Sequence, residues 1–297
     1  MRPSRRAAVA LLGLIVAAAG CETTGLSTRI GGVGGGVGIA VDSVTRLATA
    51  APTMKGAFSD LDEPQEVELG RAVTAAIGAR YRLLRDPELT RYVALVGNAV
   101  AARSARPDLR YYFGVLDTPE VNAFAAPGGF VFITRGALGL LRDEAMLAAV
   151  LGHEVGHVAL RHHVATIKAQ KRKELALLGL QEGVSHTGAA PFSSAIASGA
   201  DLVAEQVVLK GHSRAEEAEA DQVGFDYAAG AGYDPAGLRD FLSALLARGG
   251  QDTALSRFFS THPGLDERRG EQDRRLQERP GGGVRNAERF ARSVGAR

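Results

Sequence analysis

The sequence predicts an α+β domain that is mostly helical, with a small antiparallel β-sheet beside one buried helix. Three observations predict this fold. Apolar residues repeat at three- and four-residue spacing over long segments from residue 66 onward. Between residues 110 and 134, one short segment has two alternating sets of side chains, as a strand does, and another predicts a sharp reversal of the chain between strands. An almost uniformly apolar segment, 143–162, then indicates a helix that the rest of the domain buries.

Residues 1–20 predict a lipoprotein signal peptide rather than a part of the fold. Three arginines precede the apolar stretch 7–19, which is short for a membrane span, and small residues at its end lead to Cys21, the single cysteine of the chain. This junction resembles the lipobox of bacterial lipoproteins, in which the cysteine receives a diacylglyceryl group. The alternative is an ordinary secretory signal with a chance cysteine. Glu22 after the cysteine, in place of Asp, favours the outer membrane over the inner membrane.

The rest of the chain divides into three parts. Residues 21–62 are rich in glycine and predict a lipidated tether, residues 63–270 hold the domain, and residues 271–297 form a polar, arginine-rich tail that we expect to fray. The formal net charge of the chain is +2, and removal of the three arginines in residues 1–20, which hold no acidic residue, lowers it to −1. This charge does not indicate nucleic-acid binding.

The first half of the domain predicts two helices, a strand and a strand reversal. The helices and the strand are expected at residues 66–84, 87–104 and 110–117. The reversal is expected within residues 121–134. There Pro127 can occupy the first turn position, and Gly128 or Gly129 can supply a positive φ.

The second half of the domain is helical apart from residues 164–210, which are mixed in composition. Residues 213–230 predict a helix with a capping box, because Ser213 is followed three residues later by Glu216. Asp and Pro at positions 234–235 predict the start of a further helix.

The apolar pattern of the helix at 143–162 does not explain His153, Glu154 and His157. Residues four apart on a helix face the same way, so both imidazoles can bind one metal ion. The neighbouring glutamate can take a proton from a water molecule that zinc activates. The sequence therefore predicts one Zn²⁺ per chain, with Glu154 as the catalytic base. The alternative is a pair of core histidines with chance spacing.

Two histidines require a third protein ligand to form a zinc site. Within residues 213–230, Glu217 and Asp221 share a helix face with Gly224 and Ala228, small residues that let another helix approach. A solvated acidic helix is the alternative. It does not explain why two of the acids face a strip of small residues.

The two segments together resemble a known family. HEVGH (153–157) followed by SRAEEAEAD (213–221) is similar to the family of HtpX and the CAAX prenyl proteases, which are zinc metallopeptidases with a glutamate ligand and a second motif of the form S/N-R-x-x-E-x-x-A-D. The resemblance implies a zincin-like metalloprotease fold and covers residues 66–270. Residues 164–210 lack the transmembrane helices of the membrane members, as in the soluble, lipid-anchored bacterial branch.

The resemblance also implies roles for individual residues. The zinc ligands would be His153, His157 and Glu217, and Asp221 would orient a ligand histidine through its free ring nitrogen. His262 lies in a segment that resembles the family's His-Pro motif. It would be an occluding fourth ligand or a pocket residue, and a loop histidine stacked before a helix is the alternative.

A third segment resembles the family's N-A-x-x-x-P-G-G motif, which implies a strand that pairs with an extended substrate. Its candidate residues are Asn122, Ala123, Phe124, Pro127, Gly128 and Gly129. No role is expected for the other histidines, His162, His163, His186 and His212.

The function that follows is a zinc-dependent metalloendopeptidase of the bacterial cell envelope, lipid-anchored and facing the periplasm. Its expected substrates are misfolded or stalled envelope polypeptides, by analogy with the family. One alternative is a zinc-containing chaperone or assembly lipoprotein that does not cleave; the intact Glu154 argues against it. Another is a structural lipoprotein without metal. Either His262 or residues 164–210 could cover the metal at rest.

Overall fold

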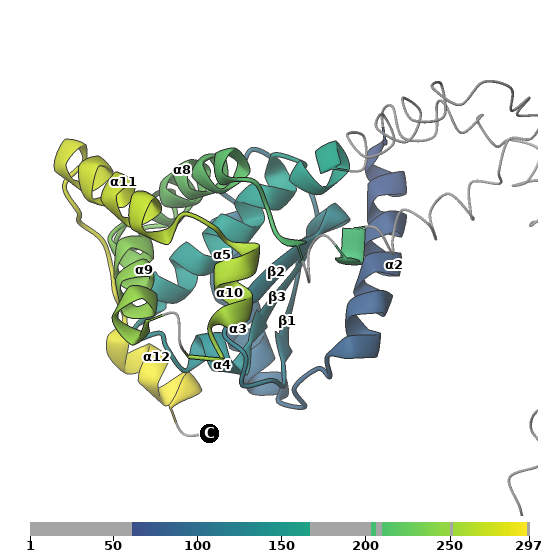
Figure 1. Ribbon diagram of the computed structural model, residues 1–297, viewed down its shortest axis with the longest axis horizontal. Helices are drawn as coiled ribbons and strands as arrows, with labels where there is room; N and C mark the ends of the chain where they lie inside the picture. The colour runs from purple at the N-terminus through teal and green to yellow at the C-terminus, as the bar shows by residue number, and fades with distance from the viewer. Residues whose placement is uncertain (1–60, 167–202, 206–209, 250–251, 296–297) are drawn as a thin grey trace, which may run out of the picture. The chain divides into compact units, whose positions relative to one another are not determined.

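The computed structural model describes residues 61–166, 203–205, 210–249 and 252–295 (Figure 1). The predictions for the signal peptide, for Cys21 and nearly all of the tether, and for most of residues 164–210 lie outside the described residues. The elements in chain order are α2 (Glu63–Arg80), α3 (Pro87–Ala101), β1 (Tyr112–Leu116), β2 (Ala123–Ala126), the 3₁₀ turn η1 (Pro127–Gly129), β3 (Phe130–Thr134), α4 (Arg135–Leu138), α5 (Glu144–Ala159), α8 (Arg214–Gly230), α9 (Gly237–Arg248), α10 (Ser256–Thr261), α11 (Leu265–Glu278) and α12 (Ala287–Val294). The α+β fold class is confirmed.

Helix α5 lies at the centre of the domain. Asp143 caps its N-terminus, because the carboxylate accepts a hydrogen bond from the N–H of Met146 at 2.9 Å. Every residue from Glu144 to Val158 is buried. Helices α3, α8 and α9 and strand β2 pack around α5 (Figure 1). Polar side chains on this helix therefore lie in the interior and need partners there.

The sheet beside α5 has three strands in the order β1-β3-β2. Strands β2 and β3 are antiparallel and are joined by η1, where Gly128 and Gly129 have φ of 72° and 94°. The predicted reversal is thus confirmed. Strands β1 and β3 are parallel, with Tyr112 opposite Phe130, so the expectation of a wholly antiparallel sheet was wrong. Alternation of side chains identifies a strand but does not encode the direction of its neighbour.

Helix α2 fixes the reversal between β2 and β3. Its buried Glu66 accepts hydrogen bonds from the N–H of Gly128 at 3.2 Å and from Arg106 at 2.8 Å. Gly70 lets the helix approach, because a Cβ there would lie 1.9 Å from the carbonyl oxygen of Pro127. The turn between β2 and β3 is therefore held by a carboxylate from a helix that is distant in the sequence.

The C-terminal part of the domain is ordered, and the expectation that residues 271–297 fray was wrong for the described ones. Helix α11 continues to Glu278, and α12 buries Phe290 against the core. Arg285, between the two helices, forms ion pairs with three aspartates, Asp143, Asp234 and Asp240. No helix among the described residues is long and apolar enough to cross a lipid bilayer.

Candidate metal centre and catalytic site

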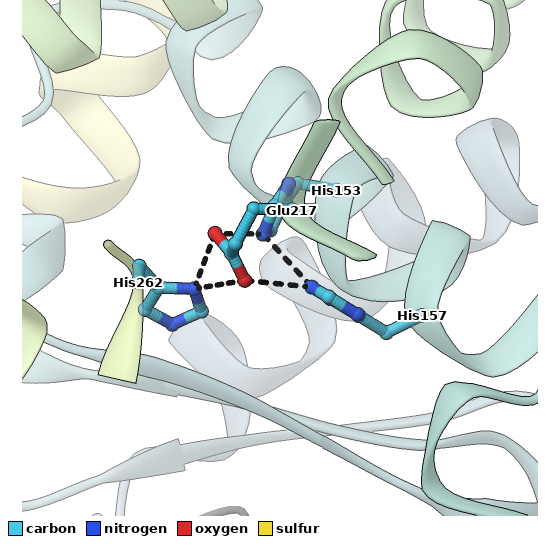
Figure 2. Close-up of side chains that lie close together, drawn as sticks. All are labelled: His153, His157, Glu217 and His262. Atoms are coloured by element: carbon cyan, nitrogen blue, oxygen red, sulfur yellow. Dashed lines mark hydrogen bonds and ion pairs between the residues drawn. The ribbon is translucent and has the colours of Figure 1, made fainter. Parts of the chain in front are cut away.

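Four side chains from three segments converge in the interior. His153 and His157 come from α5, and their Nε2 atoms lie 3.1 Å apart. Glu217 of α8 places Oε2 at 3.5 Å from the His153 Nε2 and Oε1 at 3.3 Å from the His157 Nε2. His262, the residue after α10, places Nδ1 at 3.1 and 3.2 Å from the two oxygens of Glu217 (Figure 2). Each residue offers one donor atom, and these atoms all lie within 4.8 Å of one another.

This donor set fits a zinc ion. Two imidazoles and one carboxylate form the protein ligand set of many catalytic zinc sites, which keep a fourth position for water or substrate. His153, His157, Glu217 and His262 are all almost fully buried. Buried groups of this polarity need a partner, and a divalent cation between them would satisfy all three predicted ligands.

Close packing of α5 against α8 brings Glu217 to the histidines. A Cβ at Gly224 would lie 2.8 Å from the backbone nitrogen of His153, and a Cβ at Gly152 would lie 2.9 Å from the carbonyl oxygen of Gly224. Ser213 and Glu216 form the predicted capping box at the start of α8, with hydrogen bonds of 3.3 and 2.9 Å. The strip of small residues on α8 therefore faces the zinc-motif helix.

Asp221 and Arg268 lie behind the predicted ligands. Asp221 Oδ1 is 2.8 Å from the Nδ1 of His153. Arg268 of α11 forms two ion-pair contacts with Asp221, at 2.6 and 2.7 Å, and also contacts Glu217. In the sequence, Arg268 is the arginine that follows the His-Pro pair in the segment THPGLDER (261–268), which resembles the family's His-Pro segment. Its contacts could not be read there, because its partners are on another helix.

The electrostatics of the cluster suit a metal. Burial raises the pKa of Glu217, but the charges of His262, Arg268 and His153 outweigh it and hold the pKa well below its usual value. Burial also lowers the pKa of His157 well below its usual range. The glutamate is therefore anionic and His157 neutral, the protonation states in which these groups bind a metal ion.

Glu154 lies next to this cluster on α5 and is 2% exposed. Burial lowers the pKa of His262 and of Arg268, but nearby carboxylates, chiefly Glu217 for His262 and Asp221 for Arg268 and with a smaller contribution from Glu154, outweigh it and raise both, so Glu154 shares their surroundings. His262 stacks on Phe258, with ring centroids 4.6 Å apart, and also lines a cavity of about 290 Å³ with Arg214. Both of its predicted roles, fourth ligand and pocket residue, are compatible with this position.

The candidate substrate segment lies at an edge of the sheet. Strand β2 pairs with β3 on one side, and in the described sheet no strand pairs with its other side. All six candidates are buried: Asn122, Ala123, Phe124, Pro127, Gly128 and Gly129. The Asn122 Oδ1 lies 3.5 Å from the Oγ1 of Thr261, the residue before His262. This contact connects the strand to the His-Pro segment.

Sequence reasoning missed three histidines beside His157. His162 Nδ1 lies 2.8 Å from His157 Nδ1, and His212 stacks on the His157 ring with centroids 3.8 Å apart. His163 is also buried beside them, with ring centroids 5.0 Å from His212 and 6.2 Å from His157. For His162 and His163 the available signal was their closeness to His157 along the chain; His212 is distant in sequence and gave no such signal. His186 lies outside the described residues.

Comparison with known proteins gives a family and several relatives. A sequence model described as "Peptidase family M48" matches residues 87–274. The chain is 28% identical to the "Beta-barrel assembly-enhancing protease" of Yersinia pestis over 84% of its own length and 48% of that protein. It is 31% identical to "Metalloprotease YcaL" of Escherichia coli (52% and 58% of the two chains) and 31% identical to "Mitochondrial metalloendopeptidase OMA1" of Schizosaccharomyces pombe (60% and 50%). The chain thus spans about half the length of these relatives.

Proposed function

The chain belongs to peptidase family M48, whose members are zinc metallopeptidases, and we propose that it is an endopeptidase of the bacterial cell envelope. The substrates proposed are misfolded or stalled envelope proteins that present extended segments. The relatives whose names refer to β-barrel assembly support this cellular location and this class of substrate. The observation that carries the proposal is the convergence of His153, His157 and Glu217 within 4.8 Å, with Glu154 beside them.

Each residue of the proposed site has a separate role in peptide hydrolysis. Zinc held by His153, His157 and Glu217 would supply Lewis-acid polarisation of the scissile carbonyl and of a water molecule. Glu154 accepts the proton of the attacking water and returns it to the leaving amine. Asp221 holds the ring of His153 in its binding orientation. Main-chain pairing of an extended substrate with β2 requires its outer edge to be uncovered, because Ala123–Ala126 are buried.

The decisive experiment is Glu154→Gln in the purified, zinc-loaded protein, with unfolded casein as substrate. We expect zinc content to be unchanged and cleavage to be lost, because the amide cannot accept the proton. Glu68→Gln, an exposed acid on α2, is the matched control and should cleave like the wild type. Equal cleavage by Glu154→Gln and wild type contradicts the mechanism.

The same measurements separate the alternatives. A wild-type protein that binds zinc and unfolded chains but never cleaves is the non-proteolytic chaperone or assembly lipoprotein. A protein without metal in any preparation is the structural lipoprotein. About one zinc per chain, lost in both His157→Ala and Glu217→Ala, supports the metal site.

We also propose attachment to the outer membrane through lipidated Cys21. The support is the sequence pattern of residues 1–20 followed by this cysteine. Cys21→Ser should release the protein from the membrane fraction into the periplasm, because the acyl chains provide the anchor. Retention of the serine variant in the membrane fraction contradicts the lipid anchor.

A further inference from the structure

His157 uses its two ring nitrogens in two directions. Nε2 points into the proposed metal centre, 3.1 Å from the Nε2 of His153 and 3.3 Å from Glu217 (Figure 2). Nδ1 points away from that centre and lies 2.8 Å from the Nδ1 of His162. The contacts of Nε2 belong to the proposed metal site. The contact between Nδ1 and His162 does not, and it needs a separate explanation.

The positions of the protons follow from the chemistry of a neutral imidazole, which carries one N–H and one acceptor nitrogen. If Nε2 of His157 binds the metal, its Nδ1 must carry the proton and donate it to His162. The Nδ1 of His162 is then an acceptor, so its Nε2 carries the proton. That nitrogen lies 3.1 Å from Oε2 of Glu219, which can accept it.

We infer that His162 and Glu219 are positioning residues for the metal ligand His157, through the hydrogen-bond chain His157 Nδ1–H to His162 Nδ1 and His162 Nε2–H to Glu219. This inference rests on the proposed metal site. This series of hydrogen bonds orients His157 as Asp221 orients His153, because a partner at the second ring nitrogen fixes the tautomer and the ring orientation. The two ligand histidines differ in one respect. His153 faces a buried carboxylate, whereas the chain from His157 ends at a glutamate whose side chain is 63% exposed.

The local backbone explains how His162 reaches this place. Arg161 has φ of 58°, a left-handed conformation that ends the helical path of α5 and turns the chain back. His162 and His163 consequently fold against His157 and are both buried. Arg161 is itself held by Glu66, 3.1 Å away, and by the carbonyl of Leu61.

A second metal ion is the rival explanation, since His157, His162 and His212 each offer a nitrogen within 4.8 Å of the others. Two features of the geometry oppose it. His157 would have to give a nitrogen to each ion, which requires loss of both ring protons. The rings of His157 and His212 are also nearly parallel, at 17° and 3.8 Å, so their in-plane lone pairs do not converge on one point.

The test compares zinc affinities of full-length variants by competition with a chromophoric chelator. His162→Leu removes the acceptor and should weaken zinc binding about 10- to 100-fold. His162→Asn keeps an oxygen acceptor near the position of Nδ1 and should restore affinity to within about threefold of the wild type. His163→Leu is the control, because its ring nitrogens have no hydrogen-bond partner among the described residues; it should bind zinc like the wild type. Wild-type affinity in His162→Leu overturns the inference.

Nitrogen-15 NMR of the histidine rings in the zinc-loaded wild type keeps the test independent of variant folding. The expected signature is a proton on Nδ1 of His157 and on Nε2 of His162. A proton on the Nδ1 of His162 overturns the inference, as does a second zinc equivalent that is lost with His162. Failure of the wild type to bind any zinc would instead remove the proposed function itself.

Discussion

Arg268 and Asp221 form a bidentate ion pair in the interior of the domain. The Nε and Nη2 atoms of the guanidinium lie 2.7 and 2.6 Å from the two carboxylate oxygens, and the two residues are 6% and 2% exposed. The same guanidinium contacts Glu217, so one cation compensates two buried anions. This pair joins α11 to α8 directly behind the metal centre.

Arg268→Met should destabilise the protein strongly. Removal of one partner of a buried pair leaves an uncompensated charge and typically costs about 3–5 kcal/mol. Urea unfolding of the metal-free protein measures this free energy. Arg214→Met is the matched control, because Arg214 pairs with Glu267 at the surface and should lose less than about 1 kcal/mol. Equal losses in the two variants would show that the buried pair has no special importance.

Gly224→Ala should separate α8 from α5. A methyl group there would lie 2.8 Å from the backbone of His153, so the helices must move apart and carry Glu217 away from the histidines. We expect a loss of about 1–3 kcal/mol in unfolding free energy, together with weaker zinc binding. Gly78→Ala, in α2 with open space around it, should stabilise by about 0.5–1 kcal/mol. Unchanged zinc affinity in Gly224→Ala contradicts the packing argument.

His262→Ala should raise the rate of casein cleavage if the histidine covers the metal at rest. Its Nδ1 lies with the predicted ligands within 4.8 Å, where it can occupy the position that a substrate needs. Initial rates at equal zinc content measure the effect. A lower rate with a higher KM assigns His262 to the substrate pocket instead. An unchanged rate rejects both roles.

The stability of the protein should fall as the pH drops below about 5. Burial raises the pKa of Glu144, but hydrogen bonds from Arg289, Tyr92 and Tyr233 outweigh it and lower the pKa below 4.5. A carboxyl whose pKa is lower in the folded state stabilises the fold above its unfolded pKa, and this contribution disappears as the pH falls through the folded value. Tm should therefore decrease from pH 5 to about pH 3.

Glu144→Gln tests the assignment of this pH dependence. It should lower Tm at neutral pH and make the decrease below about pH 5 shallower, because the group can no longer titrate. Glu288→Gln, at a side chain that is 95% exposed, should reproduce the wild-type curve. A wild-type slope in Glu144→Gln would assign the acid sensitivity to other carboxylates.

The helices and the turn of this fold could be predicted because their signals are local. The capping box at Ser213 and the glycines of the strand reversal each act within a few residues of chain, and both were found at the expected positions. The direction of β1 against β3 depends on how distant segments meet. It was predicted wrongly because side-chain alternation carries no information on direction.

The residues of the candidate site also divide into those that local sequence predicts and those that it does not. His153 and His157 are four residues apart on one helix, so their convergence follows from helix geometry. His162 is five residues beyond His157 and would face elsewhere on a continued helix. The left-handed residue Arg161 redirects it, and a non-glycine residue in that conformation has no reliable signal in a single sequence.

The order of the site residues along the polypeptide has a consequence for biosynthesis. A chain emerging from the ribosome exposes both histidines of α5 long before it contains Glu217 and, last of all, Arg268. A partly synthesised or truncated polypeptide therefore carries the base and two donors without the groups that complete the site. On the proposed mechanism, proteolytic competence would therefore arise only when the whole domain is present.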